Sequence, residues 1–265
     1  MAVHPAGVVV ADSYNDRVLV VALDGQLLAE HGELRTPTGV ATAADGSLLV
    51  CEEEAEQVVR IPPGSGTRLT FLGGLFLPAD VAVASDGTAY VAEAGRHRIW
   101  RVMPDGSISV LAGTGEQGLE DAYGPASRFD EPTGLAAGPL GLFVVDAGSS
   151  ALRVVDATHR VATLIGRGKS RWEGEEPFTG LQHPKGVACA PDGSSVYVAD
   201  TSNSSLRLWS GVDGHLRRLP VEGLHQPSGL DVLADGRLVV ADTGNDRVVL
   251  VDLAAETVEP LMIRS

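Results

Sequence analysis

Residues 227–247 read PSGLDVLADGRLVVADTGNDR, and this stretch decides the fold. Two apolar runs flank the dipeptide Asp235-Gly236. Asp-Gly between apolar runs favours a tight β-hairpin, because both residues adopt positive φ at low cost. The second run ends at Asp242, and a polar turn then leads to Arg247. The stretch therefore predicts two short antiparallel strands and the start of a third.

The same pattern returns along the chain. It reads PTGVATAADGSLLVCEE from Pro37, PADVAVASDGTAYVAEA from Pro78, PTGLAAGPLGLFVVDAG from Pro132 and PKGVACAPDGSSVYVADTS from Pro184. The first unit has only the later part, VVVADSYNDRVLV, from Val8. All units align on one acidic column, which consists of Asp12, Glu52, Glu93, Asp146, Asp200 and Asp242. The column predicts six repeats.

Each repeat contains four apolar runs rich in Val, Leu and Ile, and these runs show little alternation of polar and apolar residues. Strands that are buried on both faces have this composition. Four short strands repeated about every 44 residues are typical of a β-propeller. We therefore predict an all-β, six-bladed propeller with four-stranded antiparallel blades, formed by residues 1–265 as a single domain. The predicted blades span about 1–33, 34–74, 75–127, 128–179, 180–223 and 224–265.

The first unit leaves the closure of the ring open. His4-Pro5-Ala6-Gly7 resembles the start of a repeat, but it passes directly into the apolar run at Val8 without an Asp-Gly turn. Residues Glu256–Ile263 are already needed for the last strand, so 23 strands are available for 24 places. We expect either a three-stranded first blade or a strand supplied by a segment that precedes residue 1.

Charge and composition restrict the partners. Lys and Arg number 20 against 35 Asp and Glu, which gives a formal net charge of −15. Nucleic acids are bound largely through Lys and Arg, so we expect no nucleic-acid partner. The two cysteines, Cys51 and Cys189, do not indicate a disulfide framework. No signal peptide and no 18-residue apolar span occurs, so we expect a cytoplasmic protein without a membrane partner.

The repeat consensus, P-x-G-V-A followed by D-G and V-A-D-T-x-N-x-R-V, resembles the NHL repeat. Residues 12–17 (DSYNDR) and 242–247 (DTGNDR) carry the resemblance most clearly. From residue 113 onward the chain is similar to the propeller in the family of NHL repeat-containing protein 2. Members of that family carry a thioredoxin-like domain ahead of the propeller. The resemblance implies a propeller that is part of a redox-associated multidomain protein.

In such a propeller the first strand of each blade lines the central channel. The turns between the second and third strands lie on the same face as the connections between blades. The acidic column falls on this face, and two interpretations are open. Six carboxylates could attract a cation at the channel mouth. The interpretation that we favour is local, with Asp12, Asp146, Asp200 and Asp242 accepting backbone N–H groups or pairing with a nearby Arg.

Histidines form a second candidate site. His4, His31, His183 and His225 fall near the joins between blades, where neutral imidazoles could bind zinc or another transition metal. The peptide-amidating lyase is an NHL-like, metal-dependent propeller, and its metal-binding histidines directly follow the turn prolines. The residues at those positions here are Thr38, Ala79, Thr133, Lys185 and Ser228. None is a histidine, so no cofactor is predicted.

Two further sets of residues are candidates for binding a partner. Lys185 and Ser228, with His183 and His225 beside them, are expected to line the channel mouth. The loops near 113–130 and 167–182 contain Tyr123, Phe129, Arg171, Trp172 and Phe178, and long loops on a rigid scaffold often bind partners. The sequence favours a non-catalytic scaffold that presents one face to a protein or peptide. The alternative is a metal-dependent lyase or hydrolase that acts in the channel.

Overall fold

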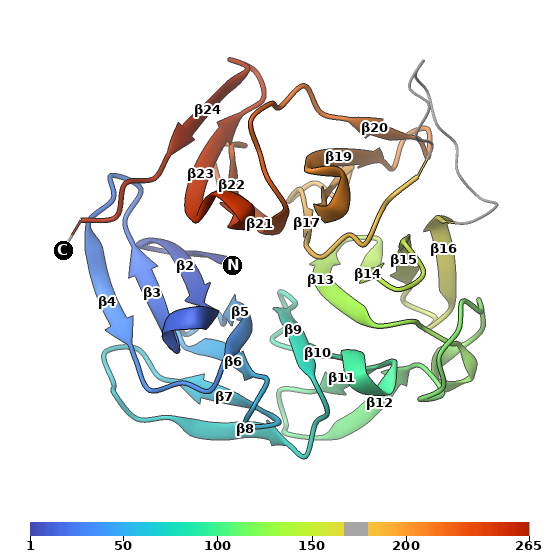
Figure 1. The fold of residues 1–265 in the computed structure, drawn as a ribbon. Coiled ribbons are helices and arrows are strands. Elements are labelled where there is room, and N and C mark those ends of the chain that lie inside the picture. Colours follow the sequence, from blue (N-terminus) through green and yellow to red (C-terminus); the bar gives the residue numbers. More distant parts are fainter. Residues whose placement is uncertain (167–179, 265) are drawn as a thin grey trace.

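The structure is a computed structural model that describes residues 1–166 and 180–264. The described residues form 24 strands, which are grouped into six four-stranded antiparallel sheets. The sheets stand like blades around a central axis, and in each blade consecutive strands run from the axis outward (Figure 1). The predicted all-β, six-bladed propeller is confirmed.

The bounds of the strands follow the repeats. Blade one contains β1 (Ala2–His4), β2 (Gly7–Asp12), β3 (Arg17–Val21) and β4 (Leu27–His31). Blade two contains β5 (Pro37–Thr42), β6 (Leu48–Glu52), β7 (Gln57–Ile61) and β8 (Leu69–Gly73). Blade three contains β9 (Pro78–Val83), β10 (Ala89–Glu93), β11 (Arg98–Val102) and β12 (Ile108–Ala112). Blade four contains β13 (Pro132–Gly138), β14 (Gly141–Asp146), β15 (Ala151–Val155) and β16 (Val161–Ile165). Blade five contains β17 (Val187–Cys189), β18 (Ser195–Asp200), β19 (Ser205–Ser210) and β20 (Leu216–Arg218). Blade six contains β21 (Pro227–Val232), β22 (Leu238–Asp242), β23 (Arg247–Asp252) and β24 (Thr257–Pro260).

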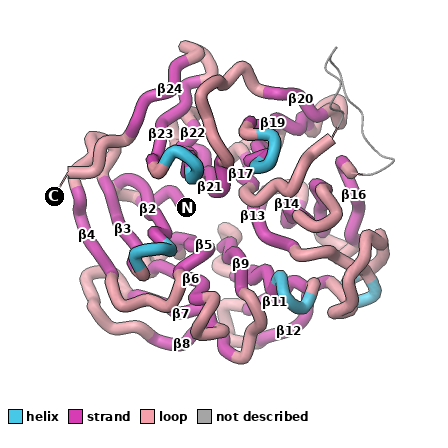
Figure 2. The backbone as a smooth tube through the Cα atoms, in the orientation of Figure 1, coloured by secondary structure: helices cyan, strands magenta, loops and turns pink. Residues whose placement is uncertain are grey.

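The helical parts of the described chain are single 3-10 turns. They are η1 (Ser13–Asn15), η2 (Ala94–Arg96), η3 (Gly124–Ala126), η4 (Thr201–Asn203) and η5 (Thr243–Asn245), drawn in cyan in Figure 2. Among the described residues, no helix has the length and apolar character that crossing a bilayer requires. Four of these turns join the second and third strands of a blade, at the acidic column.

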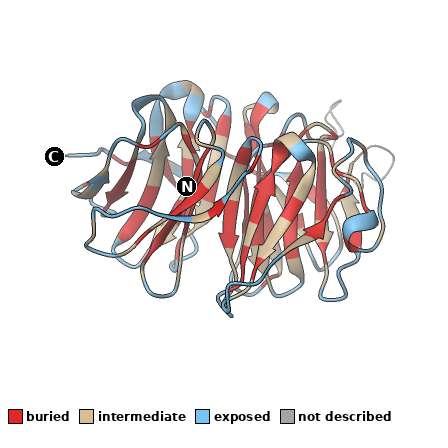
Figure 3. Cartoon of the chain, turned by 90° about the horizontal axis from the view of Figure 1, so that it is seen from below, coloured by how far each residue is buried: buried red, intermediate tan, exposed pale blue. Residues whose placement is uncertain are grey.

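The hydrophobic core is divided among the six interfaces between neighbouring blades. One cluster, for example, joins Val9 and Val18 of blade one to Val50 and Val59 of blade two. The second and third strands of the blades are therefore covered on both faces, which explains the weak alternation in their sequence, whereas outer strands such as β4 and β24 are largely exposed. Figure 3 shows the buried middle parts of the strands and the exposed loops at both ends of the blades. Burial of each such aliphatic side chain stabilises the fold by about 1.5–3 kcal/mol.

The first blade has four strands, so the expectation of a three-stranded blade or of a strand from a preceding segment is wrong. The inner strand β1 consists of only three residues, and it pairs with β2 through Ala2–Val9, Val3–Val8 and His4–Gly7. Pro5 and Ala6 form the hairpin turn in place of Asp-Gly. The other inner strands suggested a segment of eight to ten residues, and a strand of three residues is too short to produce a recognisable pattern.

Two sets of contacts close the ring between blades six and one. On the channel side, the backbone N–H of Val3 donates to Asp231 Oδ2 at 2.7 Å. On the outer side, the chain after β24 crosses to blade one. There Arg264 N–H donates to Gly25 O at 2.7 Å, and Leu27 N–H donates to Arg264 O at 2.9 Å. Each blade is thus built from consecutive residues, and the C-terminal tail links the last blade to the first.

Candidate functional site

The turns at the acidic column and the connections between blades lie on one face of the propeller, here called the upper rim. Its turns comprise residues 13–16, 53–56, 94–97, 147–150, 201–204 and 243–246, and its connections include 32–36, 74–77, 113–131, 180–186 and 219–226. The hairpin turns between the first and second strands, and between the third and fourth, lie on the opposite face, the lower rim. The upper rim holds most of the residues that the sequence predicts to be functional.

Left-handed residues repeat around the upper rim. The last residue of every turn has positive φ: Asp16 (51°), Glu56 (54°), His97 (48°), Ser150 (50°), Ser204 (48°) and Asp246 (51°). So does the residue before every turn proline: Thr36 (50°), Leu77 (50°), Glu131 (54°), His183 (41°) and Gln226 (47°). None of these residues is a glycine, so each conformation costs about 1–2 kcal/mol. Surrounding contacts must therefore fix this face.

Hydrogen bonds between blades supply those contacts. A side chain at the end of a blade's turn accepts a backbone N–H from the connection that leads from that blade to the next. Asp16 Oδ1 accepts from Thr36 (3.0 Å), His97 Nδ1 from Glu131 (3.1 Å), Ser150 Oγ from His183 (3.3 Å) and Ser204 Oγ from Gln226 (3.2 Å). In four connections, the left-handed residue is therefore anchored to the preceding blade.

The acidic column anchors the same connections to the following blade. Each carboxylate accepts the backbone N–H of the residue that directly precedes the left-handed residue of the connection. The pairs are Glu52 with Arg35, Glu93 with Phe76, Asp146 with Asp130, Asp200 with Gln182 and Asp242 with His225. Arg17, Arg207 and Arg247 donate through Nε to Asp12, Asp200 and Asp242 at 2.7–2.8 Å. The predicted local hydrogen bonding of Asp12, Asp146, Asp200 and Asp242 is confirmed.

The predicted channel-mouth residues lie on the upper rim in two neighbouring blades. His183 and Lys185 are exposed in the connection that enters blade five, and His225 is exposed in the connection that enters blade six. His225 Nδ1 lies 3.0 Å from Gly244 O, and the hydroxyl of the partly buried Ser228 lies 2.6 Å from Thr243 Oγ1. In the described chain, no hydrogen bond joins His183 or Lys185 to His225 or Ser228.

The four candidate metal ligands do not gather at one place. His4 is the last residue of β1, next to the hairpin turn on the lower rim, and its Nδ1 accepts the N–H of Ala6. The prediction that His4 lies near a join between blades, together with His31, His183 and His225, is therefore wrong. Burial lowers the pKa of His31 at the end of β4, and the nearby charge of Arg68 adds to this effect. Within residues 1–166 and 180–264, no three His, Cys, Asp or Glu side chains are placed to hold a metal ion.

The first inserted loop is anchored in the core, and part of it remains exposed. Phe129 is fully buried, and the guanidinium of the buried Arg153 lies 4.5 Å from the centre of its ring. Arg153 also donates to Glu120 O and to Asp121 Oδ1. Tyr123 is 65% exposed. Arg171, Trp172 and Phe178, the predicted anchors of the second loop, lie outside the described residues.

Two carboxylates in the channel wall were missed from the sequence. Asp80 on β9 accepts the N–H of Leu135 on β13 at 2.9 Å, and Asp231 on β21 accepts that of Val3. Burial raises the pKa of Asp80 to about 6, against the opposing effects of the Met1 amino group and of the Leu135 N–H, and burial also raises the pKa of Asp231. Asp80 stands where four other repeats have Gly, and this departure was the available signal.

Exposed apolar residues of the upper rim were also missed. Tyr14 in η1 is 97% exposed, and it occupies a position that is Gly or Ser in four other repeats. Phe76 and Leu77, in the connection that enters blade three, are 45% and 41% exposed. The guanidinium of Arg96 lies 6.0 Å from the centre of the Phe76 ring.

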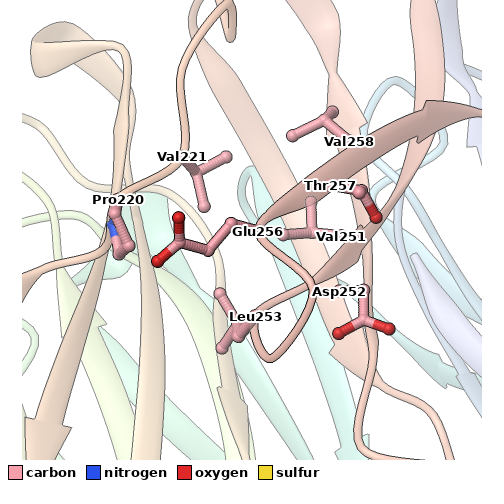
Figure 4. Close-up of a pocket in the computed structure, with 8 residues that line it drawn as sticks. All are labelled: Pro220, Val221, Val251, Asp252, Leu253, Glu256, Thr257 and Val258. Atoms are coloured by element: carbon pink, nitrogen blue, oxygen red, sulfur yellow. The ribbon is translucent and has the colours of Figure 1, made fainter.

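A small hollow of about 10 Å³ lies between the connection after β20 and the hairpin of β23 and β24. It is lined by Pro220, Val221, Val251, Asp252, Leu253, Glu256, Thr257 and Val258, and Glu256 extends toward Pro220 (Figure 4). Sites for small molecules usually measure about 300–1,000 Å³. We therefore place the candidate site on the upper rim and not in this hollow.

Comparison with known proteins agrees with the repeat pattern. The NHL repeat matches residues 77–102 and 224–249. The chain is 29% identical over 175 residues to Protein SUPPRESSOR OF QUENCHING 1, chloroplastic, of Arabidopsis thaliana, which covers 56% of this chain and 16% of that protein. It is 29% identical over 182 residues to NHL repeat-containing protein 2 of Bos taurus, which covers 58% of this chain and 25% of that protein. The chain thus matches a quarter or less of the length of either relative.

Solved structures share the fold at low sequence identity. A chain of the nidogen/laminin complex superposes with a TM-score of 0.73 at 16% identity, covering 94% of this chain and 90% of that chain. Virginiamycin B lyase from Staphylococcus aureus superposes with a TM-score of 0.68 at 15% identity, covering 99% and 83%. One of these structures comes from a protein complex and the other is a lyase, so the shared fold does not determine the function.

Proposed function

We propose that this NHL-repeat propeller, distantly similar to NHL repeat-containing protein 2, is a non-catalytic binding module that presents its upper rim to a protein or peptide. The observation that carries the proposal is the rigid display of exposed side chains on this face. Left-handed residues recur in the turns and connections, and hydrogen bonds to two neighbouring blades restrain most of the connections. A surface ordered before binding loses little conformational entropy when a partner binds.

The residues on this face suit a protein partner. Tyr14 is exposed in a turn whose flanking residues are bonded to the next connection and strand, since Ser13 donates to Pro37 O and Asp16 accepts the N–H of Thr36. Phe76 lies beside the Arg96 guanidinium. Tyrosine, arginine and other aromatic residues are enriched at protein interfaces, where a few of them supply most of the binding energy. Lys185, His183, His225 and Ser228 supply polar groups on the same rim. A net charge of −15 favours a partner that carries basic groups.

Selection of peptides tests this proposal. A random peptide library is selected against residues 1–265, and the selected peptides are measured against the double substitution Tyr14→Ala, Phe76→Ala. The control is Val212→Ala, because Val212 is 87% exposed on the lower rim. We expect the double variant to weaken binding at least about tenfold, which is typical of losing interface hot spots. Peptides that bind the double variant as well as the wild type would contradict the proposal.

Elemental analysis separates this function from the alternative, a metal-dependent lyase or hydrolase in the channel. The protein is purified without added metal and analysed for transition metals. A stoichiometric metal that is lost on substitution of His183 or His225 would favour the enzyme over the scaffold.

A further inference from the structure

We propose that Arg101 of blade three and His159 of blade four form a binding site for a small oxyanion, a carboxylate or a phosphate group. Arg101 lies on β11, opposite Tyr90 of β10 and Ser109 of β12. Directly opposite residues of an antiparallel sheet project from the same face. Tyr90 packs against the hydrophobic cluster shared by blades three and four, so this face is the one directed at blade four.

Arg101 has an unusual environment for a cation. Its Nε is inaccessible to water and has no hydrogen-bond partner. Its Nη1 lies 3.1 Å from His159 Nε2, and in the described part of the chain no carboxylate forms an ion pair with it. Arg101 as a whole is only partly buried, but a buried N–H group without a partner destabilises a protein unless another group satisfies it. The guanidinium of Arg101 therefore lacks the acidic partner that such groups usually have, and an anion bound at its Nη groups would supply that partner.

The repeat supplies an internal comparison. Arg60 occupies the position in blade two that Arg101 occupies in blade three, and it forms an ion pair with Asp45 in the hairpin turn of its own blade. The residue equivalent to Asp45 in blade three is Asp86, which accepts the N–H of Thr88 at 2.9 Å. Arg101 contacts His159 of the next blade although its own blade contains an equivalent acid. The contact between blades is thus a departure from the repeat.

His159 is fixed in place by the inserted loop. It is a left-handed residue, with φ of 64°, in the hairpin turn between β15 and β16. Its carbonyl oxygen accepts the N–H of Gly124 at 2.7 Å, and the next turn residue, Arg160, pairs with Tyr123. The loop at 113–131 therefore holds the backbone of the imidazole that faces Arg101.

Two nitrogen-bearing side chains that meet without a carboxylate suit an oxyanion. The planar guanidinium offers several N–H donors that match two oxygens of a carboxylate or phosphate. A guanidinium can only donate, so a hydrogen bond between Arg101 Nη1 and His159 Nε2 requires the imidazole nitrogen to be the acceptor. An anion between the two side chains would instead accept hydrogen bonds from the guanidinium and from an N–H of the imidazole ring. Binding should therefore change the His159 ring directly.

The test follows the His159 ring resonances by NMR in the complete chain of 265 residues. Inorganic phosphate and acetate are titrated separately at constant ionic strength, with chloride as the reference. We expect saturable shifts with at least one of the two anions. Phosphate alone indicates a phosphate-bearing ligand, and acetate alone or both indicate a carboxylate or a general oxyanion site. If neither anion produces a saturable shift beyond that of chloride, the proposal is overturned.

Two variants and one control complete the test. Arg101→Met keeps the aliphatic packing and should weaken anion binding at least about tenfold, as expected for losing charged hydrogen bonds. Arg60→Met removes the equivalent arginine of blade two and should leave binding unchanged. If Arg101→Met fails to fold, His159→Phe is measured through the thermal stabilisation that phosphate or acetate gives to the wild type, and this stabilisation should disappear. Retained anion binding in Arg101→Met or His159→Phe contradicts the site.

Discussion

The carboxylate of Asp200 accepts the backbone N–H of Gln182 at 2.7 Å, and the next N–H in the chain, that of His183, donates to Ser150 in the preceding blade. Two successive amides of one connection are thus divided between two blades. Glu52, Asp146 and Asp242 serve three other connections in the same way. The acidic column therefore positions the upper rim relative to both neighbouring blades.

Removing Asp200 should destabilise the protein strongly. Asp200→Ala deletes the acceptor for Gln182 N–H, Asn203 Nδ2 and Arg207 Nε in a fully buried position. We expect a loss of about 3 kcal/mol, because the donors lose a buried charged acceptor. Urea denaturation followed by circular dichroism measures the change.

Asp12→Ala is the matched control for that substitution. Asp12 and Arg17 form the equivalent ion pair, but their side chains are 25% and 35% exposed. Exposed pairs contribute about 1 kcal/mol or less. Equal losses for Asp12→Ala and Asp200→Ala would contradict the assigned role of burial.

The Pro-x-Gly motif of the inner strands should be sensitive to added volume. A Cβ at Gly186 would lie 2.4 Å from the carbonyl oxygen of Ser228 on the next inner strand, whereas at Gly229 the nearest atom is 3.4 Å away. Gly186→Ala should therefore cost about 2–3 kcal/mol, and Gly229→Ala less than about 1 kcal/mol. Neither glycine has positive φ, so backbone strain does not separate them. Thermal unfolding of the two variants decides; similar melting temperatures would refute the close approach of the strands.

The repeat made the blades predictable because each Asp-Gly turn and each acidic position has a local cause. β1 was not predictable in this way. Its three residues are too few to show a period, and its pairing depends on packing beside β21 and β5. Asp80 and Tyr14 could have been recognised in the sequence as unusual positions, since both replace small residues of the repeat. Only the fold shows that one lies in the channel wall and the other on the upper rim.

The ring closure can be tested at Gly25. A Cβ there would lie 2.0 Å from the carbonyl oxygen of Met262 in the C-terminal tail. Gly106 occupies the equivalent turn of blade three with similar φ (85° against 94°), and no atom lies within 4 Å of its Cβ position. Both substitutions by Ala share the left-handed strain of about 1 kcal/mol. Their difference therefore reports the tail contact alone.

Hydrogen exchange at Leu27 reads out that contact, because its N–H donates to Arg264 O. We expect faster exchange at Leu27 in Gly25→Ala and wild-type exchange in Gly106→Ala. Unfolding should also occur at a lower temperature in Gly25→Ala than in Gly106→Ala. Unchanged protection of Leu27 in Gly25→Ala would show that the tail does not close the ring.

The channel-wall carboxylate Asp80 should make stability depend on pH. Burial raises its pKa from 3.8 to about 6, so the folded state binds this proton more tightly than the unfolded state. The resulting stabilisation is complete below the unfolded pKa and is lost as the pH rises through about 6.

Asp80→Asn keeps an oxygen that can accept the Leu135 N–H, and it removes the titration of this side chain. At pH 7.5 the variant should be more stable than the wild type by about 2 kcal/mol, and at pH 4 the two should be equal. Urea midpoints measured from pH 4 to pH 8 give the difference, and groups that do not interact with Asp80, such as Asp146, cancel in it. A constant difference over this range would mean that Asp80 does not titrate as described, and a variant less stable at pH 7.5 would mean that the charge itself stabilises the channel wall.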